Sequence, residues 1–190
     1  MVMPQRKPRL TRGDWVLAGL AALGRDGLGA VAIEPVARSL GLTKGSGYWH
    51  FSSRADLVDA VLAAWLDVAT DRVVSAVQAT GGSPRERLGR LLETVLSEEV
   101  RYPGFLMLQT APTARSVVET STHRRIGYVR QLLVEAGVPR SEAGRRALLV
   151  YTSYLGYAVL AQAAPGSLPR GVRQRRELQT TMLAAALGES

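Results

Sequence analysis

Apolar residues recur at helical spacing through nearly the whole chain. After Thr11, the side chains of Val16, Leu20 and Leu23 follow at intervals that place them on one face of a helix. No window shows the sustained alternation of apolar and polar residues that a half-buried strand would have. The pattern predicts an all-α fold, with helices over residues 11–26, 35–40, 44–50, 53–79, 84–102, 112–137, 141–164 and 172–187.

Capping residues mark where several of these helices begin. Thr11 with Asp14, and Ser83 with Glu86, have the three-residue spacing of a capping box, and Pro84 suits the first position of its helix. Further N-caps are expected at Thr43, Ser53 and Ser141. The break TGGSP at 80–84 and the segment PGSLPRG at 165–171 separate the longer helices.

One segment is apolar enough to raise the question of a membrane. Residues 147–169 carry no charge, but Pro165 and Pro169 limit the helical part to about 18 residues, at the low edge of a span. A helix buried on most of its surface is therefore expected, with no membrane association. The first ten residues are basic but lack a following apolar region, so no secretory signal is expected. The chain has no cysteine, and a reducing cytoplasm is the expected location.

Positive charge is concentrated at the N-terminus. Residues 1–54 carry eight Lys and Arg against three acidic residues, a net charge of +5, whereas the remaining 136 residues carry sixteen against thirteen, a net charge of +3. This basic N-terminal segment indicates a polyanion partner, although an Arg-rich proteome would give the same excess of positive charge. Arg6, Lys7 and Arg9 are either a DNA-contacting arm or a solvated tail.

Residues 41–51 read GLTKGSGYWHF and follow a predicted short helix. A helix, a glycine-containing three-residue turn and a second short helix form a helix-turn-helix motif, whose second helix lies in the DNA major groove. Leu42 and Phe51 are expected to bury this motif against the first helix, while lysine, serine and tyrosine donors face phosphate oxygens. The alternative for residues 48–51, YWHF, is a buried aromatic cluster, but the turn before them favours DNA contact.

The segment GLTKGSGYWHFSSRADLVDAV resembles the helix-turn-helix signature of the tetracycline-repressor (TetR) family of bacterial transcription regulators. In that signature a Gly-Val/Leu turn leads to a Tyr-x-His-Phe segment, a basic residue and a leucine. The resemblance covers residues 10 to about 62, and beyond them only the helical layout agrees. It implies a helix-turn-helix domain with a basic arm at 1–54, and a helical effector-binding and dimerisation domain at 55–190.

The resemblance also implies a function and its residues. A family member of this kind would be a homodimeric transcriptional repressor that binds a palindromic double-stranded DNA operator and is released by a small-molecule effector. The DNA-facing residues carried over are Thr43, Lys44, Gly45, Ser46, Tyr48, Trp49, His50 and Arg54, the last on a phosphate. The last two long helices, 147–164 and about 172–187, are expected to form a four-helix bundle with those of a second subunit.

The sequence departs from the family pattern at Gly47, where a large apolar or aromatic residue is usual. Glycine inside a helix costs about 1 kcal/mol relative to alanine, and Gly45 lies only two residues earlier. Residues 44–50 are therefore expected to be only partly ordered without DNA. If the neighbouring core leaves space, Gly47→Leu would pre-organise the helix and raise operator affinity.

An effector cavity is expected among the aromatic residues of the C-terminal part, since ligand pockets combine aromatic walls with a few polar groups. Its candidate residues are Trp65, Tyr102, Phe105, Met107, Tyr128, Tyr151 and Tyr154, and plain core packing is the alternative for each. The identity of the effector cannot be read from these residues.

No cofactor, metal or catalytic group is expected. His50 and His123 are the only histidines, and neither has a second ligand at metal-binding spacing. The run at 27–32 nearly matches a dinucleotide-binding fingerprint, but it follows a helix where that motif needs a strand. An enzyme is thereby disfavoured, and the remaining alternative is an effector-independent DNA-binding regulator or an architectural protein.

Overall fold

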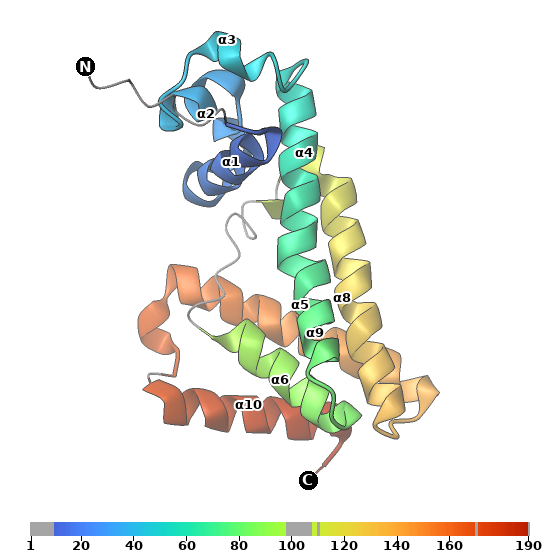
Figure 1. Cartoon of the computed structure of the whole chain (residues 1–190). Coiled ribbons are helices and arrows are strands. Elements are labelled where there is room, and N and C mark those ends of the chain that lie inside the picture. The colour runs from blue at the N-terminus through green and yellow to red at the C-terminus, as the bar shows by residue number, and fades with distance from the viewer. Residues whose placement is uncertain (1–9, 98–107, 110, 170, 190) are drawn as a thin grey trace, which may run out of the picture. The chain divides into compact units, whose positions relative to one another are not determined.

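The computed structural model describes residues 10–97, 108–109, 111–169 and 171–189, and within these residues all regular structure is helical. The all-α prediction is therefore confirmed. The molecule divides into two compact units, which are Met1–Trp65 with Pro103–Ala111 (unit 1) and Leu66–Tyr102 with Pro112–Ser190 (unit 2). Figure 1 shows the helices of each unit with the labels used below.

Unit 1 contains the helices α1 (Arg12–Asp26), α2 (Ile33–Ser39), α3 (Lys44–Gly47) and α4 (Arg54–Leu66), and the short 3-10 turn η1 (Leu28–Ala30). The predicted capping box at the start of α1 is present, because Thr11 accepts from the Asp14 backbone and Asp14 accepts from the Thr11 backbone. The backbone N–H of Thr11 lowers the pKa of the Asp14 carboxyl. Local hydrogen bonding thus fixes the start of the domain where the sequence predicts it.

The core of unit 1 is built on large aromatic side chains from three places in the chain. Trp15 of α1, Phe51 after α3 and Trp65 of α4 are all buried, and Leu23 and Leu57 are the next largest fully buried side chains. The Trp15 and Phe51 ring centroids lie 6.4 Å apart. Burial of side chains of this size stabilises a small domain by roughly 1.5–3 kcal/mol each, so this unit has a substantial core for its length.

Unit 2 contains α5 (Arg72–Ala79), α6 (Pro84–Leu96), α8 (Arg115–Glu135), α9 (Arg140–Ala163) and α10 (Gly171–Leu187), with short 3-10 turns at Pro112–Ala114 and Pro165–Ser167. The capping box of Ser83 and Glu86, with Pro84 in the first turn of α6, is present as predicted. Leucines of α6 and α8 form the centre of its core, where Leu88, Leu92, Leu132 and Leu133 are buried.

The single helix predicted over 53–79 is interrupted. It begins as expected, with the Asp56 backbone donating to the Ser53 hydroxyl at 3.2 Å. It then widens into the π-helical turn η2 (Asp67–Asp71) before continuing as α5. Such a turn inserts a residue into the helical ladder and is often found at functional positions. Apolar periodicity does not reveal it, because the helical spacing resumes after it.

One further detail of unit 2 differs from the sequence predictions. The cap of α9 is Pro139 and not Ser141, which lies inside the first turn. On α10, Ala186 is buried and Ala185 is exposed. Within the described residues, no helix is long and apolar enough to cross a membrane.

Candidate nucleic-acid interface and ligand cavity

Gly41 makes the turn between α2 and α3. Its φ is +68°, a backbone conformation that glycine adopts without steric cost. The backbone N–H of Gly41 donates to Arg38 O and that of Leu42 to Ala37 O, which closes the end of α2. Four residues, 40–43, therefore separate α2 from α3, one more than the predicted three-residue turn.

The second helix of the motif is shorter than predicted. Regular helix ends at Gly47, and the backbone N–H groups of His50 and Phe51 both donate to Gly47 O at 2.9 Å. Thr43 precedes the helix without making the predicted side-chain cap, because its hydroxyl lies 3.1 Å from the Ser46 hydroxyl instead. Residues 48–50 form a compact turn that continues from the helix.

The four residues YWHF point in two directions. The side chains of Tyr48 and Trp49 are 52% and 83% exposed, so they do not belong to a buried aromatic cluster. Phe51 is buried, and the His50 ring centroid lies 6.1 Å from that of Trp15. An exposed tryptophan on a small domain is a large apolar surface that a binding partner would cover.

The predicted DNA-facing residues around them are also accessible. Thr43, Lys44 and Gly45 are exposed, and Ser46 is partly exposed. The Lys44 ammonium lies 3.8 Å from the Glu34 carboxylate, in an ion pair that solvent screens. The chain thus presents hydroxyl, ammonium and aromatic groups on one short segment, which is the composition that phosphate and base contacts use.

Gly47 is buried because Trp15 and Ile33 already fill the space beside it. A Cβ at this position would lie 2.6 Å from Ile33 Cγ2 and 2.8 Å from Trp15 Cη2, closer than side chains tolerate. The large residue usual at this position in the family has no room here. The prediction that Gly47→Leu raises operator affinity is therefore wrong. The Trp15 indole occupies the space that a larger side chain at position 47 would need.

Arg12 holds the start of α1 to the residues after α3, a role that the sequence did not indicate. Its guanidinium donates to Asp56 Oδ1 at 2.8 Å and to His50 O at 3.3 Å. The same group lies 4.6 Å from the centroid of the Phe51 ring. Spacing in sequence gives no signal for such a contact, because its partners are 38 and 44 residues away.

Arg54, predicted to contact a phosphate, makes two bonds within the protein. Its Nε donates to Val31 O at 3.0 Å and its Nη2 to Leu28 O at 3.1 Å. These bonds tie the first residue of α4 to the loop after α1. The phosphate contact of Arg54 remains a prediction, as does the DNA-binding arm of Arg6, Lys7 and Arg9, which lies outside the described residues.

Unit 2 has a partly open cavity of about 50 Å³. Of the predicted effector residues, Tyr128, Tyr151 and Tyr154 line it. Trp65 does not; it is buried in unit 1. Tyr102, Phe105 and Met107 lie outside the described residues. The other described lining residues are Ala69, Thr70, Val73, Val74, Leu91, Leu92, Val95, Arg125, Val129 and Val150.

The polar groups of this cavity come from α8, α9 and the π-helical turn. Arg125 donates through Nε to Thr70 Oγ1 and through Nη2 to Ala69 O, each at 3.0 Å. Thr122 Oγ1 and the Tyr151 hydroxyl lie 3.2 Å apart. Burial raises the pKa of the Tyr154 hydroxyl. Aromatic character alone does not identify Arg125 and Thr70 as cavity residues, because neither side chain is aromatic.

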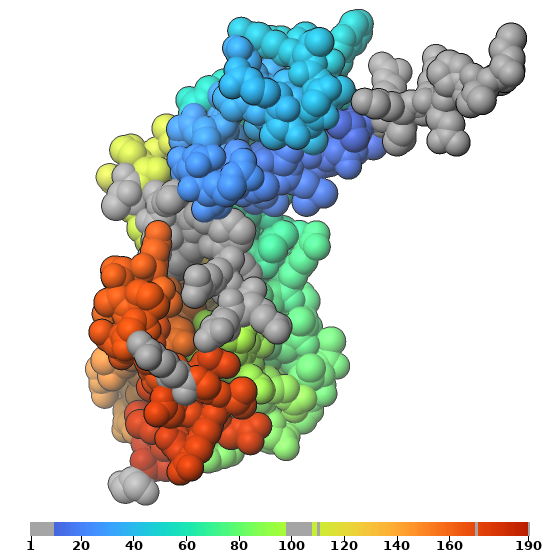
Figure 2. All heavy atoms as spheres, turned by 90° about the vertical axis from the view of Figure 1, so that its left-hand side faces the viewer, coloured from blue at the N-terminus to red at the C-terminus, as the bar shows by residue number. Residues whose placement is uncertain are grey.

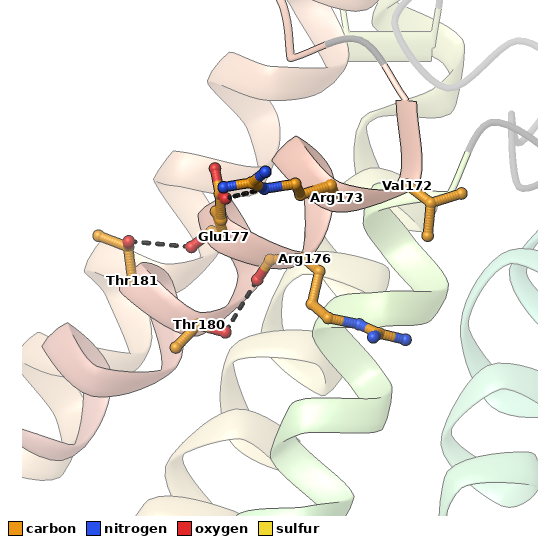
Figure 3. A pocket seen from close by; sticks show the side chains of 6 residues that line it. All are labelled: Val172, Arg173, Arg176, Glu177, Thr180 and Thr181. Carbon is orange, nitrogen blue, oxygen red and sulfur yellow. Dashed lines mark hydrogen bonds and ion pairs between the residues drawn. The ribbon is translucent and has the colours of Figure 1, made fainter.

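A second hollow is open and lies on one helix. It is lined by Val172, Arg173, Arg176, Glu177, Thr180 and Thr181, all from α10. Figure 3 shows Arg173 turned toward Glu177 and the two threonine hydroxyls turned back to the helix backbone. Polar groups satisfied within one helix do not converge on a ligand, so this hollow is a surface feature of α10.

The helix predicted to be buried on most of its surface exposes an apolar stripe in the single chain. Leu148 and Leu149 are exposed, and so are Val159 and Leu160 eleven residues later, three turns along the same face of α9. Between them lies Gly156, where an added Cβ would meet no described atom within 4 Å. Figure 2 shows the orange and red surface formed by the end of α9 and by α10.

No cluster of three or more histidine, aspartate or glutamate side chains able to hold a metal ion exists among the described residues. His123 is exposed, and its Nδ1 lies 2.8 Å from Glu119 O within its own helix.

Comparison with known proteins agrees with this geometry. Residues 16–61 match the family model described as bacterial regulatory proteins, tetR family. The chain is 34% identical over 77 residues to the HTH-type transcriptional repressor KstR2 of Mycobacterium tuberculosis, a match that covers 40% of this chain and 38% of that relative. The chain thus aligns with well under half the length of this relative.

Solved structures of regulators share the fold over nearly the whole chain. A transcriptional regulator from Rhodococcus sp. Rha1 has a TM-score of 0.75 at 19% identity, covering 94% of this chain and 97% of that one. A regulator from Saccharomonospora viridis, solved in complex with choline, has a TM-score of 0.74 at 19% identity, covering 90% and 94%. KstR2 of M. tuberculosis has a TM-score of 0.61 at 21% identity, covering 99% and 97%.

These matched proteins are regulators of transcription and not enzymes, which confirms the expectation of a non-enzymatic protein. The family model covers the exposed helix-turn-helix described above, and the solved regulators share the remaining helices. Residues 16–61 are therefore similar to the tetR family of bacterial regulatory proteins, and the chain shares the fold of solved transcriptional regulators.

Proposed function

We propose that this protein is a cytoplasmic transcriptional repressor that binds a palindromic DNA operator as a homodimer and is released by a small-molecule effector. The observation that carries the proposal is the outward presentation of Tyr48 and Trp49 beside Lys44, on a helix-turn-helix whose other aromatic residues are buried. Solvent-exposed aromatic and basic groups at this place in the fold are suited to a DNA backbone and its grooves.

The apolar stripe of α9 supports a dimer. Four large aliphatic side chains on one face exceed the scattered exposure that is normal for a monomer. Gly156 would let the backbone of a second helix approach closely, and α10 beside it adds the exposed Val172. A second copy of the same two helices is the occupant we propose for this face, since it would bury both stripes in one four-helix bundle.

The cavity in unit 2 supports an effector. It has apolar walls with a few polar groups, which is the composition of small-molecule sites. The S. viridis relative was solved with choline, so a small ligand for this chain is a reasonable part of the same proposal. In the proposed DNA-facing set, Arg54 contacts a phosphate and also fixes the start of α4 through its bonds to Val31 O and Leu28 O.

Fluorescence anisotropy with labelled DNA from the promoter region of the protein's own gene tests this function. Trp49→Ala should weaken binding strongly, whereas Leu17→Ala, which truncates a similarly exposed apolar residue on α1 of the same unit, should leave affinity unchanged. Equal effects of the two substitutions would contradict the proposed DNA-binding surface.

A further inference from the structure

Gly156 lies at the centre of the exposed side of α9. The residues three, four and seven positions before and after it fall on the same side of the helix. They are Leu149, Thr152, Ser153, Val159, Leu160 and Ala163, and all are exposed. The buried residues of the helix lie on the opposite side and are Ala143, Ala147, Val150 and Tyr151. One side of α9 therefore packs within its own unit, and the side centred on Gly156 is exposed.

Large and small side chains are arranged on this exposed side in a particular order about Gly156. At each spacing, one of the two residues that flank the glycine is large and the other is small. In an antiparallel pair of α9 helices with a two-fold axis at Gly156, each residue faces the one at equal distance on the other side of the glycine. The facing pairs are Leu149 with Ala163, Leu160 with Thr152, and Val159 with Ser153. Every pair joins a large residue to a small one, which is how packed layers interdigitate.

Other arrangements of two α9 helices fit this surface less well. In a parallel pair each residue meets its own copy, so large side chains collide and the glycines leave a gap. An antiparallel pair centred four residues earlier, at Thr152, places Arg145 against Val159 and buries a charge without a partner. Residues 147–169 carry no charge, so the pairing centred on Gly156 avoids this cost.

We propose that the α9 helices of two copies cross antiparallel, with their closest approach at Gly156. This inference rests on the proposed function, because it specifies how the homodimer of that regulator is built. A Cβ added at Gly156 meets no described atom within 4 Å, so packing within the subunit does not require glycine there. Glycine lowers helix stability relative to alanine. Close contact with a second backbone gives it a role, since the distance between packed helices depends on the side chains at the crossing.

Two glycines of α9 provide a matched pair of variants. Neither Gly156 nor Gly144 has a described atom within 4 Å of an added Cβ, but position 144 lies about a third of a turn round the helix from position 156. Gly156→Leu should raise the dimer dissociation constant at least about tenfold, because the crossing is overpacked. Gly144→Leu should leave it unchanged, and circular dichroism should show both variants as helical as the wild type. Equal dissociation constants in sedimentation overturn the proposal.

Cross-linking tests the register directly. The chain has no cysteine, so introduced thiols react only with each other. In the double variant Thr152→Cys with Leu160→Cys, each thiol faces the other position in the second copy, and mild oxidation should give a covalent dimer. In either single variant the two thiols are about 12 Å apart along the helices, too far for a disulfide. A double variant that cross-links no better than the single variants overturns the register.

The wild type separates this inference from the proposed function. If it sediments as a dimer that Gly156→Leu does not dissociate and the two thiols do not link, the homodimer stands and the crossing at Gly156 is wrong. If it is a monomer at concentrations that bind the operator, both proposals fail. If Gly156→Leu is monomeric and keeps full operator affinity, the crossing stands and operator binding by a dimer is wrong.

Discussion

The two units differ in how their interiors are filled. In unit 1 the Trp15 indole occupies the space beside Gly47 so completely that even a methyl group does not fit. In unit 2 a cavity remains open beside the unsatisfied Tyr128 hydroxyl, and α9 leaves leucines on the surface. Unit 1 also has a buried donor without a described partner, Trp15 Nε1, but its ring is packed against those of His50 and Phe51.

This difference matches the work proposed for each unit. A domain that presents Tyr48 and Trp49 to DNA benefits from a rigid support, because misplaced side chains lose their contacts. A domain that admits a ligand and pairs with a second subunit needs space and apolar surface that the single chain leaves uncovered. The cavity and the exposed apolar surface of unit 2 therefore suit ligand binding and dimerisation. Substitutions in unit 2 and matched substitutions in the filled core of unit 1 distinguish these roles.

The largest effect is expected from a charge placed on the α9 stripe. In Leu149→Glu each subunit would bury an unpaired carboxylate at the proposed interface, which costs about 3 kcal/mol or more and lowers the dimer constant at least about hundredfold. Leu17→Glu is the matched control in unit 1, because Leu17 and Leu149 are 64% and 65% exposed. Sedimentation should show monomers for Leu149→Glu alone. A dimer of unchanged mass would exclude this face as the interface.

The next effect concerns the two glycines of α3. Gly47→Ala should destabilise unit 1 by about 1–3 kcal/mol, the usual cost of overpacking, because the new methyl meets Trp15 and Ile33. Gly45→Ala has only Thr43 Oγ1 nearby, at 3.9 Å, and should stabilise the helix by about 0.5–1 kcal/mol.

Tryptophan fluorescence measures both glycine variants selectively, since all three tryptophans of the chain, Trp15, Trp49 and Trp65, belong to unit 1. The urea midpoint of the fluorescence transition should move in opposite directions for the two variants. A shift of the same sign in both would mean that the packing around Gly47 relaxes more easily than the geometry indicates.

Local signals in the sequence predicted the helix-turn-helix and most helix boundaries. Thr11 with Asp14 and Ser83 with Glu86 specify their helix ends through residues three positions apart, so one sequence is enough to find them. The pairing of Trp15 with Gly47 depends on two elements that meet only after folding. The pattern of residues along the chain does not show that the Trp15 indole fills the space left by the missing side chain of Gly47.

The ligand cavity was predictable only in part for the same reason. Aromatic character selected Tyr128, Tyr151 and Tyr154, which line the cavity, and also Trp65, which is not among its described lining residues. Arg125 was overlooked because a lone arginine in a helix is normally solvated. The hydrogen bonds of Arg125 to the π-helical turn join residues more than fifty positions apart. No local sequence pattern predicts such a contact.

A smaller effect should separate two cations near the DNA-binding surface. Lys44→Ala removes an exposed charge and should lower the slope of log affinity against log salt by about 0.9, the value for one phosphate contact, with unchanged thermal stability. Arg54→Ala removes the guanidinium donor from Val31 O and one of the two donors of Leu28 O, and should destabilise unit 1 by about 1 kcal/mol. A reduced slope in Arg54→Ala would show that this arginine contacts phosphate as well.

The smallest expected effect is on the pH dependence of stability that the two described capping boxes, one in each unit, contribute. The backbone N–H of Thr11 lowers the pKa of Asp14, and that of Ser83 lowers the pKa of Glu86. A carboxyl with a lowered folded pKa stabilises the protein above its unfolded pKa, about 4 for these residues, and loses that contribution as the pH falls through the folded value. Asp14→Asn and Glu86→Gln lack the charge at every pH. Each wild-type helix should therefore be more stable than its variant at pH 7, and the difference should shrink below about pH 4.

Tryptophan fluorescence compares the wild type with Asp14→Asn, and amide exchange in α6 compares the wild type with Glu86→Gln. A difference that grows as the pH falls would show that the neutral carboxyl, and not the carboxylate, makes the better cap.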